Sequence, residues 1–138
     1  MDSRPLWIGF AAALLAAGCG DAPFRVIAVR GAVAYEDGEA LPSEGFKLKF
    51  VPQIEAVDEK TFPRIATAQV GPDGKFEGVT TYRYHDGLTV GEHLVYLQFG
   101  APSAGSRVVP EEYLDSQSTP LRIDFDGSGP LDIRIPRP

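Results

Sequence analysis

The sequence predicts an all-β protein, an antiparallel β-sandwich of about seven strands, and three observations lead to this prediction. Apolar and polar residues alternate with a period of two in five stretches of the chain after Cys19, as they do in strands that bury one face. Asp-Gly pairs, which are typical of tight hairpin turns, fall between these stretches. No stretch after Cys19 has a convincing apolar stripe with the 3.6-residue period of a helix.

The alternating stretches define the expected strands and the expected core. Within each stretch, residues at every second position share one face. In three of them, lysine, arginine or aspartate occupies the opposite positions, which indicates a solvent-facing side. The residues expected to share a face are Val29, Gly31, Val33 and Tyr35; Phe46, Leu48 and Phe50; Val95, Leu97 and Phe99; Leu121, Ile123 and Phe125; and Leu131, Ile133 and Ile135.

Glycine-containing pairs predict where the chain turns. We expect residues 72–75 to form a tight turn between the run 65–70 and Phe76, and residues 126–129 to join the last two strands as a hairpin. One helical turn is predicted at 110–113, where a proline occupies a first-turn position. The Asp-Gly pairs are Asp37-Gly38, Asp73-Gly74, Asp86-Gly87 and Asp126-Gly127.

The start of the chain predicts export. Leu6 to Ala17 is an uncharged run of 12 residues, which fits the apolar centre of a signal peptide and is shorter than the ~20 residues that span a bilayer. Small residues then precede Cys19, the only cysteine. This arrangement resembles the lipobox of bacterial lipoproteins, in which the cysteine is acylated and becomes the new N-terminus. A plain secretory signal and a buried N-terminal helix are the alternatives.

The lipobox resemblance implies a division of the chain into three parts. Residues 1–18 are the expected signal peptide, residues 19–24 the lipidated N-terminus and a short tether, and residues 25–138 the β-domain. The implied location is a bacterial envelope membrane, to which lipid on Cys19 anchors an exported domain.

Composition narrows the set of partners. The formal net charge is −6, which argues against nucleic acid and anionic lipid headgroups as partners. With Cys19 acylated, no thiol remains for a disulfide bond or a zinc site. We expect no cofactor.

Longer motifs resemble a known family. The segments VRGAVAYEDGEAL, GFKLKFVP, RIATAQVGPDGKF, DGLTVGEHLVYL and VPEEYLDSQSTPLRIDF follow one another in this order. Together they resemble the transthyretin-like, carboxypeptidase-regulatory-like domains of small bacterial lipoproteins over roughly residues 25–136. The resemblance implies an Ig-like sandwich of about seven strands, and because its motifs are turn and core residues it says little about function.

Catalysis is not expected. His85 and His93 are the only histidines, and their spacing across a turn does not place both on one helix face as metal ligands. We expect His85 to lie in a surface turn and His93 at a strand edge. The catalytic branch of the family, the hydroxyisourate hydrolases, ends in Tyr-Arg-Gly-Ser, whereas this chain reads DIRIPRP. No catalytic residue is assigned.

A calcium loop is not expected either, although part of its pattern is present. Residue 135, at position 12 of the EF-hand pattern, is isoleucine instead of the bidentate glutamate, and no helices are predicted beside the loop. The sequence therefore predicts an Asp-Gly hairpin and no metal site. The matching residues are Asp124, Asp126, Ser128 and Asp132 at positions 1, 3, 5 and 9, with Gly129 at position 6.

Residues 80–87, which read TTYRYHDG, are the candidate ligand-binding segment. Tyr82 and Tyr84 are expected on one face, with Arg83 and His85 on the other. Tyr82, Tyr84 and His85 could contact a sugar or a peptide, or the tyrosines could simply cover the core with their hydroxyls in water.

These observations favour a non-enzymatic, lipid-anchored envelope protein that acts as an adhesion or interaction module. The expected partner besides the membrane is an envelope protein or polysaccharide. A structural accessory domain of an envelope assembly is the first alternative. A hydrolase with an unrecognised loop site is the second.

Overall fold

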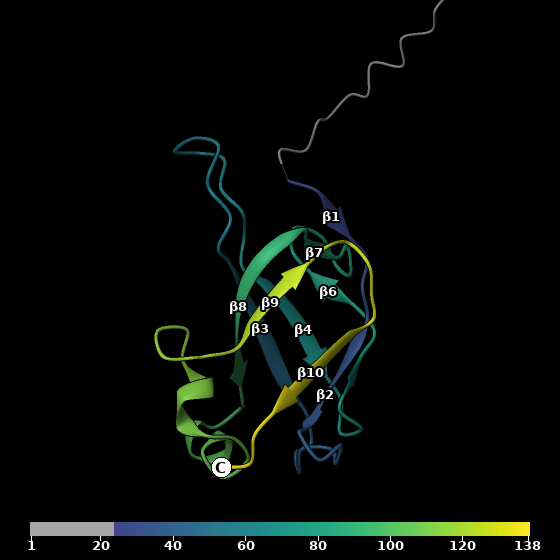
Figure 1. Cartoon of the computed structure of the whole chain (residues 1–138), viewed down its shortest axis with the longest axis vertical. Helices are drawn as coiled ribbons and strands as arrows, with labels where there is room; N and C mark the ends of the chain where they lie inside the picture. Colours follow the sequence, from purple (N-terminus) through teal and green to yellow (C-terminus); the bar gives the residue numbers. More distant parts are fainter. Residues whose placement is uncertain (1–23) are drawn as a thin grey trace, which may run out of the picture.

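The computed structural model describes residues 24–138. The predicted signal peptide and Cys19 therefore lie outside the described residues. Strands dominate this part of the chain, and they form several sheets in which most neighbours are antiparallel (Figure 1). The prediction of an all-β protein is confirmed.

Ten strands occur within residues 24–138, more than the seven or so predicted. The difference arises from strands of two residues, which are too short to show an alternating pattern. The strands are β1 (Val26–Ile27), β2 (Gly31–Tyr35), β3 (Phe46–Pro52), β4 (Ala66–Val70), β5 (Lys75–Phe76), β6 (Val79–Thr80), β7 (Leu88–Thr89), β8 (Gly91–Gln98), β9 (Arg122–Phe125) and β10 (Leu131–Ile135).

The largest sheet has five strands in the order β6-β4-β3-β8-β9, and all of its neighbours are antiparallel. Its central strand is β3, where Leu48 lies opposite Ala68 of β4 and Leu97 of β8. All three side chains are buried. The alternation read from FKLKF is confirmed, because Phe46, Leu48 and Phe50 are buried and Lys47 is exposed.

The second sheet has the order β10-β2-β5, and a two-stranded sheet pairs β1 with β7. Strand β10 runs parallel to β2, with Ile133 opposite Val33. Among the described strands this pair departs from the predicted antiparallel arrangement, which the other pairs follow. The predicted hairpin at Asp126-Gly127 is wrong. Strand β9 belongs to the large sheet and β10 to the second, so the segment between them crosses from one sheet to the other.

Both of the larger sheets contribute to one hydrophobic core. Leu48 and Phe50 of β3 belong to the same buried cluster as Val33 of β2 and Ile133 and Ile135 of β10. Fully burying one such side chain stabilises the fold by about 1.5–3 kcal/mol. The inward positions predicted for the strands therefore coincide with the core.

The turns follow the predicted glycines. Gly38, Gly74, Gly87 and Gly127 all have positive φ angles, a backbone conformation that glycine adopts without a steric penalty. The tight turn at Asp73-Gly74 is confirmed, since the N–H of Gly71 donates to the carbonyl of Lys75 at 3.0 Å. It leads from β4 to β5, which pairs with β2 in the second sheet.

Helical structure within residues 24–138 is limited to two short turns. The predicted turn is a 3-10 helix, η1 (Glu111–Leu114), which directly follows Pro110. The helix α1 (Pro102–Gly105) was not predicted. In the described part of the chain, no helix has the length and apolar character needed to cross a membrane.

Candidate functional site

The candidate site is centred on residues 80–87, which are the last residue of β6 and the loop that leads to β7. We call this segment the 80–87 loop. The Asp86 carboxylate organises it. One oxygen accepts from the N–H of Thr81 at 2.8 Å, and the other accepts from the N–H groups of Tyr82 at 3.0 Å and Arg83 at 3.1 Å. Partial burial acts to raise the pKa of Asp86, but these backbone N–H groups hold it below its ordinary value.

Further hydrogen bonds close the loop on itself. The Thr81 hydroxyl donates to the carbonyl of Gly87 at 2.6 Å, and the N–H of Gly87 donates to the carbonyl of Val79 at 2.8 Å. The N–H of His85 donates to the hydroxyl of Thr80 at 3.0 Å. The loop backbone is therefore held by its own side chains although much of it faces solvent.

Two aromatic rings stack at the tip of this loop. The rings of Tyr84 and His85 lie 3.9 Å apart between centroids and 14° from parallel. Tyr84 is 83% exposed. His85 has a φ angle of +55°, the only positive value among the non-glycine residues described, and such backbone conformations cost on the order of 1–3 kcal/mol. We call these two side chains the Tyr84–His85 pair.

The imidazole ring of His85 packs directly against the backbone of Gly78. A Cβ atom placed on Gly78 would lie 2.5 Å from Cγ of His85 and 2.7 Å from its Nδ1. Real side-chain atoms do not approach so closely, so the ring position depends on the absence of a side chain at residue 78. The position of His85 is thus determined by three features, which are the stack with Tyr84, the left-handed backbone and Gly78.

The structure corrects the predicted arrangement of these residues. Residues 81–85 form a turn and not a strand, so the expected alternation does not exist. Tyr84 and His85, predicted on opposite faces, stack on each other. Tyr82 instead lies under the guanidinium group of Arg64, 5.0 Å from the ring centroid. Tyr82 and Tyr84 are both exposed, so neither is part of the core.

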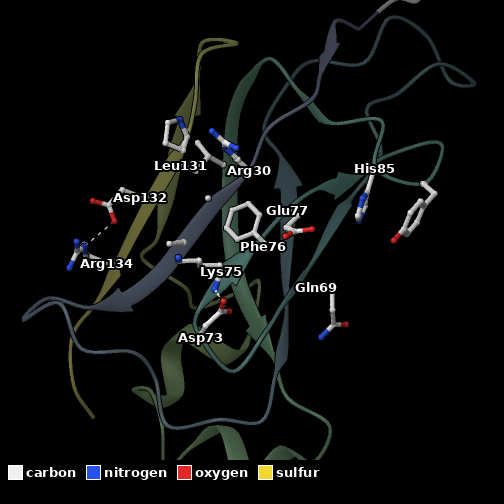
Figure 2. Close-up of a pocket in the computed structure, with 14 residues that line it drawn as sticks. Arg30, Gln69, Asp73, Lys75, Phe76, Glu77, His85, Leu131, Asp132 and Arg134 are labelled. Atoms are coloured by element: carbon white, nitrogen blue, oxygen red, sulfur yellow. Dashed lines mark hydrogen bonds and ion pairs between the residues drawn. The ribbon is translucent and has the colours of Figure 1, made fainter.

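An open cleft extends from the Tyr84–His85 pair across the second sheet (Figure 2). Its apolar lining residues are Phe76, Leu131, Ala32 and Pro130. Charged side chains of both signs surround them, and Arg134 forms an ion pair with Asp132 at 3.0 Å. The charged lining residues are Arg30, Lys75, Arg134, Asp73, Glu77 and Asp132.

The equal numbers of basic and acidic groups make the cleft a mixed surface of hydrogen-bond donors and acceptors without a strong field of one sign. Figure 2 shows His85 to one side of the cleft and Asp132 and Arg134 at the other. An uncharged, hydroxyl-rich ligand or an extended peptide can accept hydrogen bonds from the basic side chains and donate hydrogen bonds to the carboxylates. The lining therefore presents both hydrogen-bond donors and acceptors to a molecule in the cleft.

His93 does not belong to this site, and its predicted place at a strand edge is wrong. It lies within β8 and is fully buried. Its Nε2 is 2.7 Å from the carbonyl oxygen of Thr89, and its ring meets that of Phe50 edge to face. Burial lowers the pKa of His93, and the hydrogen bond to Thr89 opposes this effect only in part.

The aspartates that match the EF-hand pattern do not form one site. The Asp126 carboxylate accepts from the N–H of Ser128 at 2.8 Å and from its hydroxyl at 2.6 Å, and the Ser128 hydroxyl is the main reason that the pKa of Asp126 lies below its ordinary value. Asp124 and Asp132 lie on strands of different sheets. No group of three or more potential metal-ligating side chains occurs within residues 24–138.

Two residues that organise the site went unrecognised in the sequence. Asp86 was read only as part of an Asp-Gly turn, although an aspartate that precedes a turn glycine commonly accepts hydrogen bonds from nearby backbone N–H groups. Gly78 carried no local signal, because its role depends on a ring seven residues away. Comparison with family models, curated proteins and solved structures gives no match for this chain.

Proposed function

We propose that this protein is a non-enzymatic, lipid-anchored protein of a bacterial envelope. Its domain would be a transthyretin-like, Ig-like β-sandwich that acts as an interaction module, and the leader with Cys19 would anchor it. Two features support the proposal. The leader has the length and small residues of a lipobox, and two sheets of the domain share one core.

The observation that carries the binding role is the exposed Tyr84–His85 pair on a loop that is held by its own hydrogen bonds. Ordering an exposed aromatic side chain on binding costs free energy, and a side chain that is already stacked loses less freedom. One face of the tyrosine ring lies against the imidazole, so the opposite face remains for a ligand. A flat apolar face beside a cleft of mixed charge fits a sugar ring, whose C–H groups stack while its hydroxyls form hydrogen bonds.

We therefore place an envelope polysaccharide first among the ligands, and a protein segment second. The acidic net charge of −6 supports an uncharged or weakly charged glycan over a polyanionic one. An accessory domain without a soluble ligand and a hydrolase with a loop site are the alternatives. Binding of a glycan without turnover would distinguish the module from both.

The test is a binding titration of purified envelope polysaccharides with Tyr84→Ala, Gly78→Ala and the parent chain. Removing one aromatic contact worth about 0.5–1.5 kcal/mol weakens binding about two- to tenfold. Gly78→Ala should weaken binding as well, because its methyl group displaces the His85 ring. Tyr84→Ala should keep the parent's unfolding midpoint within a few degrees, since Tyr84 is exposed. Gly78 is buried, so the affinity of Gly78→Ala is compared with that of the parent at a temperature where its circular dichroism spectrum shows it folded.

Arg83→Ala is the matched control, because Arg83 is exposed in the same loop without belonging to the stacked pair. Equal affinity of Tyr84→Ala and Arg83→Ala for a polysaccharide that the parent chain binds would place the contact elsewhere. Conversion of the polysaccharide to shorter chains by the purified protein would favour the hydrolase.

A further inference from the structure

A long hairpin arm projects from the large sheet. Residues 53–65 connect β3 to β4, and they extend beyond the sheet as the teal loop in Figure 1. We call this segment the 53–65 arm. It contains 13 residues, many more than the two to five residues that usually join two hairpin strands, so connecting β3 to β4 does not require its length.

The base of the arm is fixed to the domain. The N–H of Gln53 donates to the carbonyl of Glu92 at 2.8 Å. Ile54 packs so closely on Gly91 that a Cβ atom there would lie 2.7 Å from Cδ1 of Ile54. On the returning side, the guanidinium group of Arg64 lies over the ring of Tyr82. These contacts determine the direction in which the arm leaves the domain.

The tip of the arm is closed by its own hydrogen bonds. The N–H of Val57 donates to the carbonyl of Thr61 at 2.9 Å. The Asp58 carboxylate accepts from the N–H groups of Lys60 at 2.8 Å and Thr61 at 2.7 Å, and these bonds hold the pKa of Asp58 below its ordinary value. The tip is an ordered turn.

Apolar side chains are exposed along this arm. Val57 is 63% exposed, Phe62 56% and Ile65 54%. The other large hydrophobic residues exposed in the described chain are Tyr82 and Tyr84, which belong to the 80–87 loop. Val57 and Phe62 flank the tip of the arm, whereas Ile65 lies at its base next to β4. Large apolar side chains that a projecting segment leaves exposed are typical of a contact surface.

The arm and the start of the domain lie at the same end of the molecule (Figure 1). Phe24 is buried and precedes β1, so it is a fixed point of the domain. Five residue steps separate it from Cys19, a reach of at most about 18 Å. The arm has about five residues between Ile54 and its tip, which span a similar distance of about 17 Å.

From this geometry we propose that the tip of the 53–65 arm inserts Val57 and Phe62 into the interfacial region of the bilayer. The inference rests on the proposed lipid anchor at Cys19, because the short tether is what holds this end of the domain beside the membrane. The arm has three acidic and two basic residues, so the contact is with zwitterionic lipid and depends on apolar burial. The arm would then orient the domain, with the opposite end directed away from the membrane.

The test uses tryptophan as a depth probe. The only tryptophan is Trp7 in the predicted signal peptide, so the mature chain has none. Phe62→Trp is purified as the lipidated protein and reconstituted into neutral phosphatidylcholine vesicles with bromine on the acyl chains. Emission should be blue-shifted and most of it lost to quenching. Pro138→Trp is the control, because the C-terminus lies at the opposite end (Figure 1), and its emission should remain.

Each other result would contradict the inference. Equal quenching of Phe62→Trp and Pro138→Trp, with fatty acid present on Cys19, would overturn the arm's role and leave the proposed anchor intact. Absence of fatty acid on Cys19 would overturn both. A blue shift of Phe62→Trp without quenching by bromine would mean that a protein, either a second copy or a partner, covers the arm. Val57→Trp gives the same measurement if Phe62→Trp does not fold.

Discussion

At the scale of single residues, His93 is a buried histidine whose protonation affects the stability of the fold. Its side chain is fully buried on the inner side of β8. Nδ1 has no hydrogen-bond partner among the described residues, and burial lowers the pKa of the ring. The folded domain therefore holds His93 neutral, and a proton on this ring opposes folding.

This burial predicts a loss of stability in mild acid. Because the folded pKa of His93 lies below its ordinary value of 6.5, the unfolded chain binds a proton first as the pH falls. The contribution of neutral His93 to the free energy of unfolding is therefore fully present above about pH 6.5 and is lost as the pH falls toward the folded pKa. The total loss is about 1.4 kcal/mol for each unit by which the folded pKa lies below the unfolded one. Urea denaturation of the parent and His93→Gln at about pH 7.5 and about pH 5.5 should show a smaller loss in the variant, whose amide can still donate to the carbonyl of Thr89.

His85→Gln, which replaces the exposed histidine, is the matched control for that comparison. If His93→Gln loses as much stability as the parent chain between the two pH values, another group causes the loss. If His85→Gln alone removes the loss, the responsible histidine is in the 80–87 loop.

At the scale of elements, β3 is the strand on which the large sheet depends. It lies at the centre of five strands, and its side chains alternate between the core and solvent. Leu48 is fully buried and Lys47 is exposed. The two residues are adjacent in sequence, so they differ in the face that they occupy and hardly in backbone environment.

Leu48→Ala should lower the free energy of unfolding by about 2–5 kcal/mol, because it leaves a cavity in the core that the large sheet shares with the second sheet. Lys47→Ala should change it by no more than about 0.5 kcal/mol. Chemical denaturation followed by far-UV circular dichroism measures both. Similar losses in the two variants would contradict the register of β3.

At the scale of the whole molecule, the central prediction concerns Cys19, which lies outside the described residues. If Cys19 is acylated, the full chain expressed in bacteria should incorporate a fatty-acid probe and partition into detergent. Cys19→Ser should abolish both, since serine has no thiol to acylate. Two acyl chains give durable membrane binding, at about 0.8 kcal/mol per buried CH₂ group.

The domain itself is the internal control for the Cys19 experiment. The purified β-domain of Cys19→Ser should keep the circular dichroism spectrum of the parent, because the substitution lies outside the predicted β-domain and Phe24 is the first buried residue among those that the structure describes. Equal labelling of parent and variant would contradict lipidation of Cys19 and, with it, the membrane role of the 53–65 arm.

Local patterns in the sequence were sufficient for the features that depend on neighbouring residues. Alternation in FKLKF and LDIRI identified which side chains are buried, because successive residues of a strand point to opposite faces. Asp-Gly pairs located turns such as Asp73-Gly74, because glycine adopts positive φ angles without strain.

Tertiary structure alone decided the features that depend on partners distant in sequence. The parallel pairing of β10 with β2 joins segments about 100 residues apart. A period of two in the sequence indicates which residues of a strand share a face, but it does not indicate which strand lies beside it. The burial of His93 follows from its place between strands of the large sheet. The Tyr84–His85 stack requires the Asp86 hydrogen bonds and the missing side chain of Gly78. Such contacts are set by the packing of the whole chain, and this is why the sequence pointed to the candidate segment but not to its geometry.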